Sequence, residues 1–223
     1  MDITRRRELA GRLLDGYVHG PAAATEATAR ALAKAAAADA VVLVEGISDQ
    51  IAVETLAVRR GRDLGAEGVV VLPAGGAHGV TRYLMQFGPG GAGLRLAGLC
   101  DLGEEHVFRR GLARAGIGSP RTRDDMERLG FYVCVEDLED ELIRAIGAGR
   151  VEALIDSQGD LGSFRSLQRQ PQWRGQPAAA QLRRFLGSGA TRKLRYARLL
   201  AGAVDLDRLP HPLDALLPGS SPR

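Results

Sequence analysis

The chain has 223 residues, of which 45% are hydrophobic and 26% charged, an ordinary balance for a protein that buries a sizeable core. Its first residues, MDITRRRELAGRLLDGY, interleave charged with apolar side chains and do not resemble a secretory signal peptide, so we expect none. The strongly apolar run Val41–Val44 is far too short to cross a bilayer, so we expect a cytoplasmic protein with no membrane partner.

The net charge of +3 hides an asymmetry along the chain. Residues 160–223 carry 11 basic and 4 acidic residues, whereas residues 1–159 carry 19 and 23. A basic C-terminal third is typical of proteins that contact an anionic partner such as nucleic acid, although a solvated helical face has the same composition. Cys100 and Cys134 form no metal or redox motif, and we expect both to be buried hydrophobes.

The chain begins with two expected helices. Ile3–Tyr17 carries apolar residues close to a 3.6-residue period, and Ala22–Ala38 is rich in alanine. Strands and helices then alternate, because four short apolar runs are each followed by turn residues and a helical pattern. The expected strands are Ala40–Val44, Gly68–Leu72, Leu94–Cys100 and Phe131–Val135, and the expected helices are Asp49–Arg60, His78–Phe87, Glu104–Ala115, Arg123–Leu129 and Leu138–Ile146.

Continuous apolar strands that alternate with amphipathic helices predict an α/β fold, with a four-stranded parallel sheet of the Rossmann-like kind covered on both faces. After Gly149 no strand pattern is present, and four helices are expected. The expected organisation is therefore N-terminal helices over residues 1–39, an α/β domain over 40–149 and a C-terminal helical segment over 150–223. The four C-terminal helices are Val151–Gln158, Leu161–Gln168, Pro177–Leu186 and Ala190–Val204.

Three of the four expected strands run into acidic residues. Glu45 ends the first strand and Asp101 ends the third, while the fourth leads into Glu139 and Glu141. The carboxyl ends of parallel strands share one edge of the sheet, and neighbouring strands lie about 4.8 Å apart. Carboxylates held together there would repel one another and raise their pKa values unless a hard cation such as Mg²⁺ neutralised them. The sequence therefore predicts a divalent metal site at this edge.

Each acid also has a structural interpretation. Asp49 follows Ser48 at a helix start, where an acid suits the helix dipole and Ser48 can cap. Glu139 and Glu141 lie in the first turn of a helix, where acids are favoured. Glu45 fits a structural role least well, because it terminates an apolar strand directly before a glycine.

Four blocks of this sequence resemble the TOPRIM domain of the overcoming-lysogenization-defect (OLD) nuclease family, with the same order and spacing. The later segments GSFRSLQRQPQWRG and GSGATRKLRYARLLAGAVDLDRLPHPLDALL resemble the helical region that follows this domain in the family. The four blocks are VVLVEGISDQIAVETLA, VVVLPAGGAHGV, LAGLCDLGEE and LEDELIRAIG.

The resemblance implies a domain that binds Mg²⁺ or Mn²⁺ and makes or breaks phosphodiester bonds. It assigns catalytic roles to Glu45, Asp101 and Lys193, the last being a basic residue that the family places near the scissile phosphate. The implied metal ligands are Glu45, Asp49, Asp101, Glu104, Glu105, Glu139 and Glu141.

The sequence departs from the family in two ways. The second position of the DxD motif is Gly103, so Glu104 or Glu105 must supply the missing ligand or one metal site is lost. OLD proteins carry an ABC-type ATPase before the TOPRIM domain, whereas about 40 residues precede it here, which implies a stand-alone module. The expected function is a metal-dependent DNA endonuclease or nickase. The alternatives are a non-catalytic module that binds metal or nucleic acid and works with a partner ATPase, and a phosphotransfer enzyme acting on small nucleotides.

Overall fold

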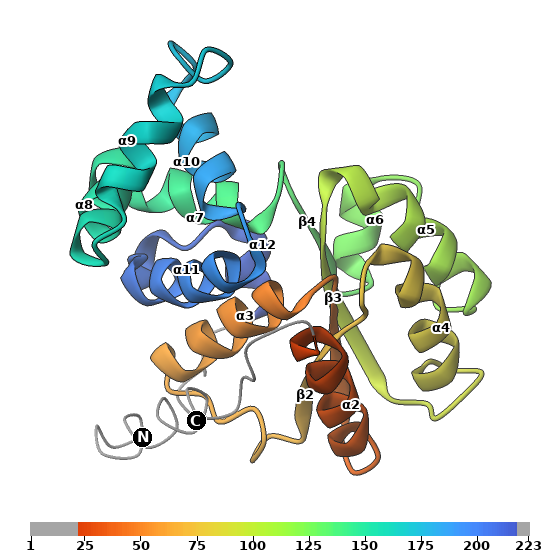
Figure 1. The fold of residues 1–223 in the computed structure, drawn as a ribbon. Helices are drawn as coiled ribbons and strands as arrows, with labels where there is room; N and C mark the ends of the chain where they lie inside the picture. Colours follow the sequence, from red (N-terminus) through yellow and green to blue (C-terminus); the bar gives the residue numbers. More distant parts are fainter. Residues whose placement is uncertain (1–21, 218–223) are drawn as a thin grey trace.

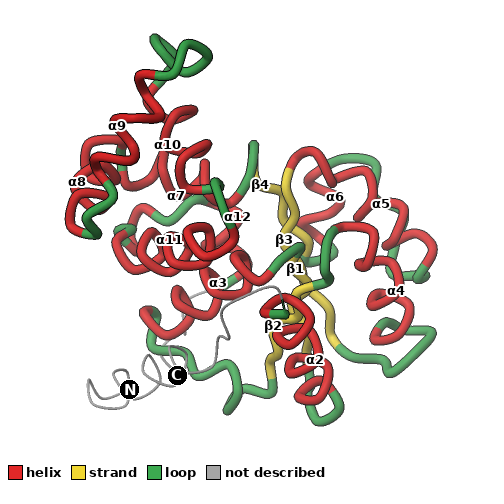
Figure 2. The backbone as a smooth tube through the Cα atoms, in the orientation of Figure 1, coloured by secondary structure: helices red, strands yellow, loops and turns green. Residues whose placement is uncertain are grey.

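The computed structural model describes residues 22–217, which form an α/β fold around one central sheet (Figure 1). All neighbouring strands run parallel, in the order β2-β1-β3-β4. Figure 2 shows the strands between two groups of helices. The four strands are β1 (Ala40–Val44), β2 (Val69–Pro73), β3 (Arg95–Asp101) and β4 (Phe131–Cys134).

Alternate residues of each strand supply two separate cores. In β1, Val41 and Leu43 belong to the core on one face, while Val42 and Val44 belong to the core on the other. All four of these side chains are buried, which is why the strand is apolar throughout instead of alternating with polar residues.

The first face is covered by four helices, and the core beneath them includes Phe108, Met126 and Phe131. The α2 helix lies near the outer strand β2, and its Thr28 hydroxyl donates a hydrogen bond to the Pro73 carbonyl oxygen at 2.9 Å. The helices of this face are α2 (Ala23–Ala35), α4 (Ala77–Phe87), α5 (Glu105–Arg114) and α6 (Arg123–Arg128), with the 3₁₀ turn η1 (Leu102–Glu104) before α5.

The second face is covered by α3 and by the helices that follow β4. Phe164, Phe185 and Tyr196 are fully buried in the same core as Val42 and Val44 of the sheet. Arg59 of α3 donates hydrogen bonds to the carbonyl oxygens of Ala201 and Val204 at the end of α11, at 2.8 and 2.6 Å. The helices of this face are α3 (Ile47–Arg59), α7 (Leu138–Ile146), α8 (Ala148–Ser157), α9 (Leu161–Arg169), α10 (Ala178–Leu186), α11 (Ala190–Ala203) and α12 (His211–Leu216), with η2 (Leu206–Arg208) before α12.

The predicted fold class is confirmed, and the observed elements follow the predicted ones closely. β1 and α7 have the predicted bounds, while β2 is shifted by one residue to include Pro73. Where a helix was expected over Glu104–Ala115, the structure has the 3₁₀ turn η1 followed by α5, which begins at Glu105. The α8 helix begins three residues earlier than expected, at Ala148. The helix expected over Ile3–Tyr17 lies outside the described residues, and the proposed domain boundaries stay predictions. None of the helices within residues 22–217 has both the length and the apolar character that a membrane span requires.

Candidate functional site

The strand order places Glu45 and Asp101 side by side, as their positions at the ends of parallel strands predicted. β1 pairs directly with β3, and the backbone N–H of Asp101 donates a hydrogen bond to the Glu45 carboxylate at 2.8 Å. Glu45 leaves β1 where Gly46 begins the turn into α3, so its side chain extends along the edge toward the neighbouring strand end. This contact defines the centre of what we call the acidic edge: Glu45, Asp49, Asp101, Glu104 and Glu139.

Burial and mutual repulsion raise the pKa values of Glu45, Asp49, Asp101 and Glu139. Burial, followed by the negative charges of Glu45 and Asp49, raises the pKa of Asp101 to about 8. Burial also raises the pKa of Glu45, with the Asp101 N–H opposing this change and the charge of Glu104 adding to it. In both cases burial is the larger cause and repulsion between neighbouring carboxylates adds to it, so both effects disfavour the ionised forms.

The expectation that Ser48 caps this helix is wrong, because α3 begins at Ile47 and Gly46 is its N-cap; Asp49, in the first turn, makes the capping contact in its place. Its carboxylate accepts a hydrogen bond from the Gly46 N–H at 2.8 Å, which caps the start of α3, and lies 3.4 Å from the Ser48 hydroxyl. Burial nevertheless raises the pKa of Asp49 to about 6, against the opposing effects of Lys193 and of the Gly46 N–H. The negative charge of Asp49 also contributes to the raised pKa of Asp101, so this capping residue is electrostatically part of the acidic edge.

Glu139 and Lys193 join the edge from two different helices of the second face. Glu139 is buried in the first turn of α7, and its Oε1 has no hydrogen-bond partner among the described residues. The Lys193 ammonium, in the first turn of α11, lies 3.4 Å from this oxygen, an ion-pair contact that is long for a hydrogen bond. Burial lowers the pKa of Lys193, but the attraction of Glu139 and Asp49 outweighs it and leaves the pKa raised. Lys193 is therefore the cation that the fold itself brings to the acidic edge.

The two glutamates that follow Gly103 have different surroundings. Glu105 pairs with Arg109 and, at 3.0 Å, with Arg123. Glu104 has no ion pair or hydrogen bond to another described side chain, and its charge acts on Glu45. Of the two, Glu104 is the one that the structure brings toward the acidic edge.

Glu141 is committed to the backbone of the turn after β4. Its carboxylate accepts a hydrogen bond from the Val135 N–H at 2.8 Å and forms an ion pair with Arg144 at 2.7 Å.

Two arginines near the acidic edge were not expected from the sequence: Arg144 and Arg183. Arg183 forms ion pairs with Asp137 and, at 3.2 Å, with Glu136. Arg144 lies four residues after Asp140 and three after Glu141 on one helix, and this spacing could have indicated its ion pairs. No local signal indicates Arg183, because its partners lie more than 40 residues away in the chain.

The donor set of the acidic edge fits a divalent metal ion chemically. Every candidate ligand offers carboxylate oxygens, which Mg²⁺ and Mn²⁺ prefer, and the buried Glu139 Oε1 lacks a hydrogen-bond donor that would satisfy it. As the side chains stand, no three His, Cys, Asp or Glu residues within the described part of the chain converge on a point suited to a metal ion. The fit therefore rests on donor chemistry and on the buried Glu139 Oε1, whose contact with Lys193 is long for a hydrogen bond.

An all-parallel sheet in this order, with acids from two adjacent strand ends and from the helices after them, agrees with the TOPRIM-like domain that the sequence predicted. Residues 38–102 match the family model described as "Overcoming lysogenization defect protein-like, TOPRIM domain". This match covers residues 38–102 and confirms the resemblance found in the motifs of that segment.

Solved structures of OLD proteins share the fold well beyond the matched segment. The C-terminal region of the Xanthomonas campestris pv. campestris OLD protein is 22% identical, with a TM-score of 0.63 over 82% of this chain and 92% of that one. The corresponding region of the Burkholderia pseudomallei OLD protein is 21% identical, with a TM-score of 0.57 over 81% of this chain and 95% of that one. No curated protein matches the sequence.

Proposed function

We propose that this protein is a metal-dependent phosphodiesterase that cuts or nicks DNA. An OLD-like TOPRIM domain is a metal-binding domain of the nuclease type. The observation that carries the finer proposal is the acidic edge itself. It gathers carboxylates with raised pKa values around one lysine at the carboxyl ends of β1 and β3.

Each residue of the edge has a role that its surroundings support. Glu45 and Asp101 would hold the metal ion or ions, together with Asp49 and Glu139, and Glu104 would take the place of the missing second Asp of the DxD motif. When bound, a divalent cation supplies charge neutralisation at the phosphoryl group that is transferred.

The remaining acids support this arrangement from outside it. Glu141 would position the turn after β4 through the Val135 N–H, and Glu105 would anchor α5 through its two arginines. Both residues stay in the predicted ligand set only as candidates, because each already has cationic partners.

Lys193 would act on the substrate. Its ammonium reaches the acidic edge from α11 and remains protonated at neutral pH, because its pKa is raised. A fixed positive charge there would stabilise negative charge that develops on the phosphate during cleavage. The basic residues of the C-terminal helices would contact the nucleic-acid backbone without reading its sequence.

The test is plasmid cleavage by the purified protein across a titration of Mg²⁺ and of Mn²⁺. We expect supercoiled plasmid to become nicked or linear only when a divalent cation is present. Glu45→Gln and Asp101→Asn should abolish cleavage, and Lys193→Ala should slow it by about 10²-fold. Glu26→Gln, which makes the same change at an exposed residue of α2, should cleave like the original protein. Cleavage that survives Glu45→Gln would refute the proposed site.

A non-catalytic role remains a second candidate because of one observation. Gly103 stands where the family has a metal-binding Asp, and nothing lies within 4 Å of the position that a Cβ would occupy there. A module of this kind would bind metal or nucleic acid and act with a partner ATPase, as the ATPase-linked architecture of OLD proteins suggests. Saturable Mn²⁺ binding that requires Glu45, without cleavage of any plasmid form, would select this candidate.

A further inference from the structure

The hairpin formed by α9, the loop of residues 170–177 and α10 lies in a stretch of the chain that has no acidic residue. Residues 161–204 include nine arginine or lysine residues and neither an aspartate nor a glutamate. Figure 1 shows the loop of the hairpin at the top of the view, where α9 and α10 extend away from the sheet. The hairpin therefore carries positive charge outward from the body of the fold.

Near the acidic edge, cations of this stretch are already paired. Arg183 of α10 forms ion pairs with Asp137 and, at 3.2 Å, with Glu136, both in the turn after β4. Lys193 of α11 lies against Glu139. These cations balance acids of the protein itself, so they leave little net positive charge for a partner.

Three other arginines of the hairpin are exposed and have no acidic partner within residues 22–217. Arg169 ends α9, and the guanidinium of Arg174, in the loop, donates a hydrogen bond to the Arg169 carbonyl oxygen at 3.3 Å. Arg184 lies three residues after Gln181, whose amide donates to the Trp173 carbonyl oxygen at 2.7 Å. Arg184 is therefore on the side of α10 that meets the loop. We call these three residues the free arginines: Arg169, Arg174 and Arg184.

The hairpin is held in one shape by its own contacts. The buried side chain of Gln181 accepts a hydrogen bond from Gln168 of α9 at 2.7 Å and donates one to the loop. The rings of Phe164 on α9 and Phe185 on α10 are both buried, with their centroids 5.2 Å apart. A surface that is already ordered loses less conformational entropy when a partner binds to it.

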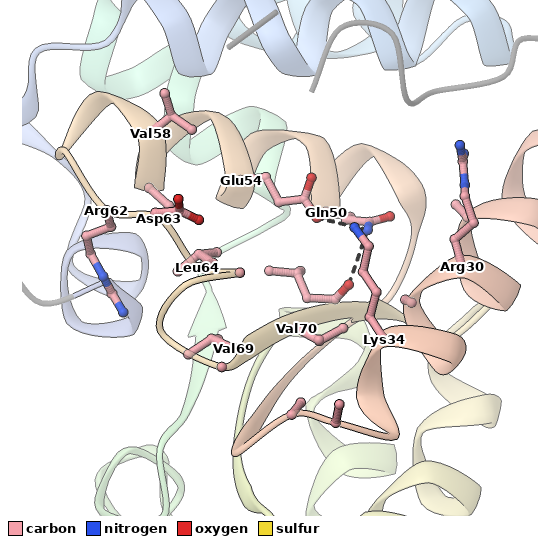
Figure 3. Close-up of a pocket in the computed structure, with 18 residues that line it drawn as sticks. Arg30, Lys34, Gln50, Glu54, Val58, Arg62, Asp63, Leu64, Val69 and Val70 are labelled. Atoms are coloured by element: carbon pink, nitrogen blue, oxygen red, sulfur yellow. Dashed lines mark hydrogen bonds between the residues drawn. The ribbon is translucent and has the colours of Figure 1, made fainter. Parts of the chain in front are cut away.

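The pocket beside β2 offers no comparable selection of charge. It is lined by cations and acids alike, as Figure 3 shows for Arg30, Lys34, Glu54 and Asp63. The free arginines, by contrast, present positive charge alone. We therefore assign an anionic partner to the hairpin and not to this pocket.

The side chains of the hairpin fit a phosphate backbone better than an apolar surface. Guanidinium groups bind phosphate through two parallel hydrogen bonds. The large hydrophobic side chains that are exposed among the described residues all lie outside the hairpin: Met85, Leu102 and Val135. The exposed amides of the loop add uncharged donors of the kind that contact nucleic-acid backbones: Gln170, Gln172 and Gln176.

We propose that the α9–α10 hairpin is an arm that binds the phosphate backbone of a DNA duplex extending past the acidic edge. DNA as the partner follows from the proposed function, on which this assignment rests. Arg183 ties the hairpin to the turn after β4, next to the edge. A duplex with one phosphate at the edge would therefore meet the free arginines as it continues outward, and they would add affinity without reading its sequence.

The experiment is titration of the full chain with a labelled duplex of about 30 base pairs in EDTA, which prevents cleavage and any bridging of DNA to the acidic edge by a cation. We expect a hairpin variant to bind at least about tenfold more weakly than the original protein at low salt. The slope of log affinity against log salt should become shallower by about 2–3, because each lost phosphate contact removes about 0.9 from it. The hairpin variant combines Arg169→Gln, Arg174→Gln and Arg184→Gln.

The matched control removes three exposed arginines that also lack an ion pair within the described residues, but from β3 and α5. It loses the same charge as the hairpin variant and should bind the duplex within about twofold of the original protein. The control combines Arg95→Gln, Arg110→Gln and Arg114→Gln.

Trp173 gives a second measurement, because it is the single tryptophan of the chain and lies in the hairpin loop. Saturation with DNA should change its fluorescence in the original protein and in the control. DNA that the hairpin variant still binds should change the fluorescence of Trp173 much less.

Three results would overturn the proposal. Equal binding by the hairpin variant and the control would refute the arm while leaving the proposed function intact. No binding of DNA by the original protein at low salt would refute both. Equal displacement of the duplex by polyglutamate, at the same concentration of charge, would point to an acidic protein as the partner.

Thermal unfolding shows whether each variant has folded. If the hairpin variant has not, Arg174→Gln alone decides the outcome, with an expected decrease of about 0.9 in the salt slope. Because cleavage is not measured, an acidic edge that does not cut DNA would leave the expected result unchanged.

Discussion

At the scale of single residues, Asp101 is in strong electrostatic conflict with its surroundings at the acidic edge. It ends a buried strand, and its neighbours across and along the edge are acids, so both desolvation and repulsion favour its protonated form. The ionised form of such a buried carboxyl group destabilises the fold unless a cation neutralises its charge. The effect of Asp101 on the stability of the protein is therefore a test of whether a metal ion binds at this edge.

The stability of the metal-free protein should fall as the pH rises. The pKa of Asp101 goes from 3.8 in the unfolded chain to about 8 in the folded one, so the folded state holds the proton more tightly. The stabilising contribution is complete below about pH 4 and is lost as the pH rises through 8, on the order of a few kcal/mol at most. Urea unfolding in EDTA at pH 5 and pH 8.5 measures this loss. Asp101→Asn should largely remove it, and added Mg²⁺ should restore stability at pH 8.5. A pH-independent free energy of unfolding would contradict the assigned cause.

Glu104 is expected to have taken over the ligand position that Gly103 lost. Glu104→Ala should then abolish cleavage about as fully as Asp101→Ala, because Glu105 is already paired with two arginines. Gly103→Asp should fold normally, since Gly103 does not have a positive φ and a Cβ there meets open space. It should also add little activity if Glu104 already serves the site. A silent Glu104→Ala combined with an activating Gly103→Asp would show instead that the second metal position is empty in the natural sequence.

At the scale of elements, the β1–α3 turn has both a structural and a chemical role. Asp49 caps α3 through the Gly46 N–H while its charge contributes to the acidic edge. The two roles can be separated because an amide oxygen caps as well as a carboxylate but carries no charge.

Asp49→Asn should therefore keep the stability of the fold while weakening metal binding. Asp49→Ala should lose both, at a cost of about 1 kcal/mol for the missing cap. Chemical denaturation gives the stability, and Mn²⁺ titration followed by calorimetry gives the affinity. If Asp49→Asn binds Mn²⁺ as tightly as the original protein, Asp49 is a helix cap only.

At the scale of the whole molecule, the C-terminal helices share a core with the sheet. Leu200 of α11 is fully buried together with Val42, and α11 is also tied to α3 through Arg59. The division of the chain at residue 149 should therefore not correspond to an independently stable domain.

We expect the chain to unfold in one cooperative transition. Leu200→Ala should lower the free energy of unfolding by about 2–5 kcal/mol, because it opens a cavity in the shared core. The same truncation at Leu102, which is exposed, should have little effect. Far-ultraviolet circular dichroism and Trp173 fluorescence should report the same midpoint. Two separate transitions, or a fragment of residues 1–149 that folds alone, would contradict this expectation.

DNA binding should weaken steeply with salt if the C-terminal helices contact phosphates, since each neutralised phosphate releases counterions. The effective charge should be smaller than the sequence suggests, because Arg165, Arg183 and Arg195 already pair with acids. The slope of log affinity against log salt, measured with two unrelated duplexes, gives the number of phosphate contacts. Affinity that does not change between low and physiological salt would exclude this interface.

The sequence by itself determined the elements and the kind of chemistry. The length and β-branched content of the apolar run Ala40–Val44 predicted a strand buried on both faces, and Glu45–Gly46 marked its end, so β1 has the predicted bounds. The acids after the strands were visible because a charged residue that ends an apolar run is conspicuous in any context. Local composition and periodicity are enough for such features, since they depend on neighbours in the chain.

Only the tertiary structure decided which of these acids act together. The order β2-β1-β3-β4 is what places Glu45 against Asp101, and the packing of α11 on α3 is what brings Lys193 to Glu139. Arg123 draws Glu105 into an ion pair from 18 residues away, which no spacing rule anticipates. Periodicity shows that a face is buried, but the partner that buries it is selected by the packing of the whole chain.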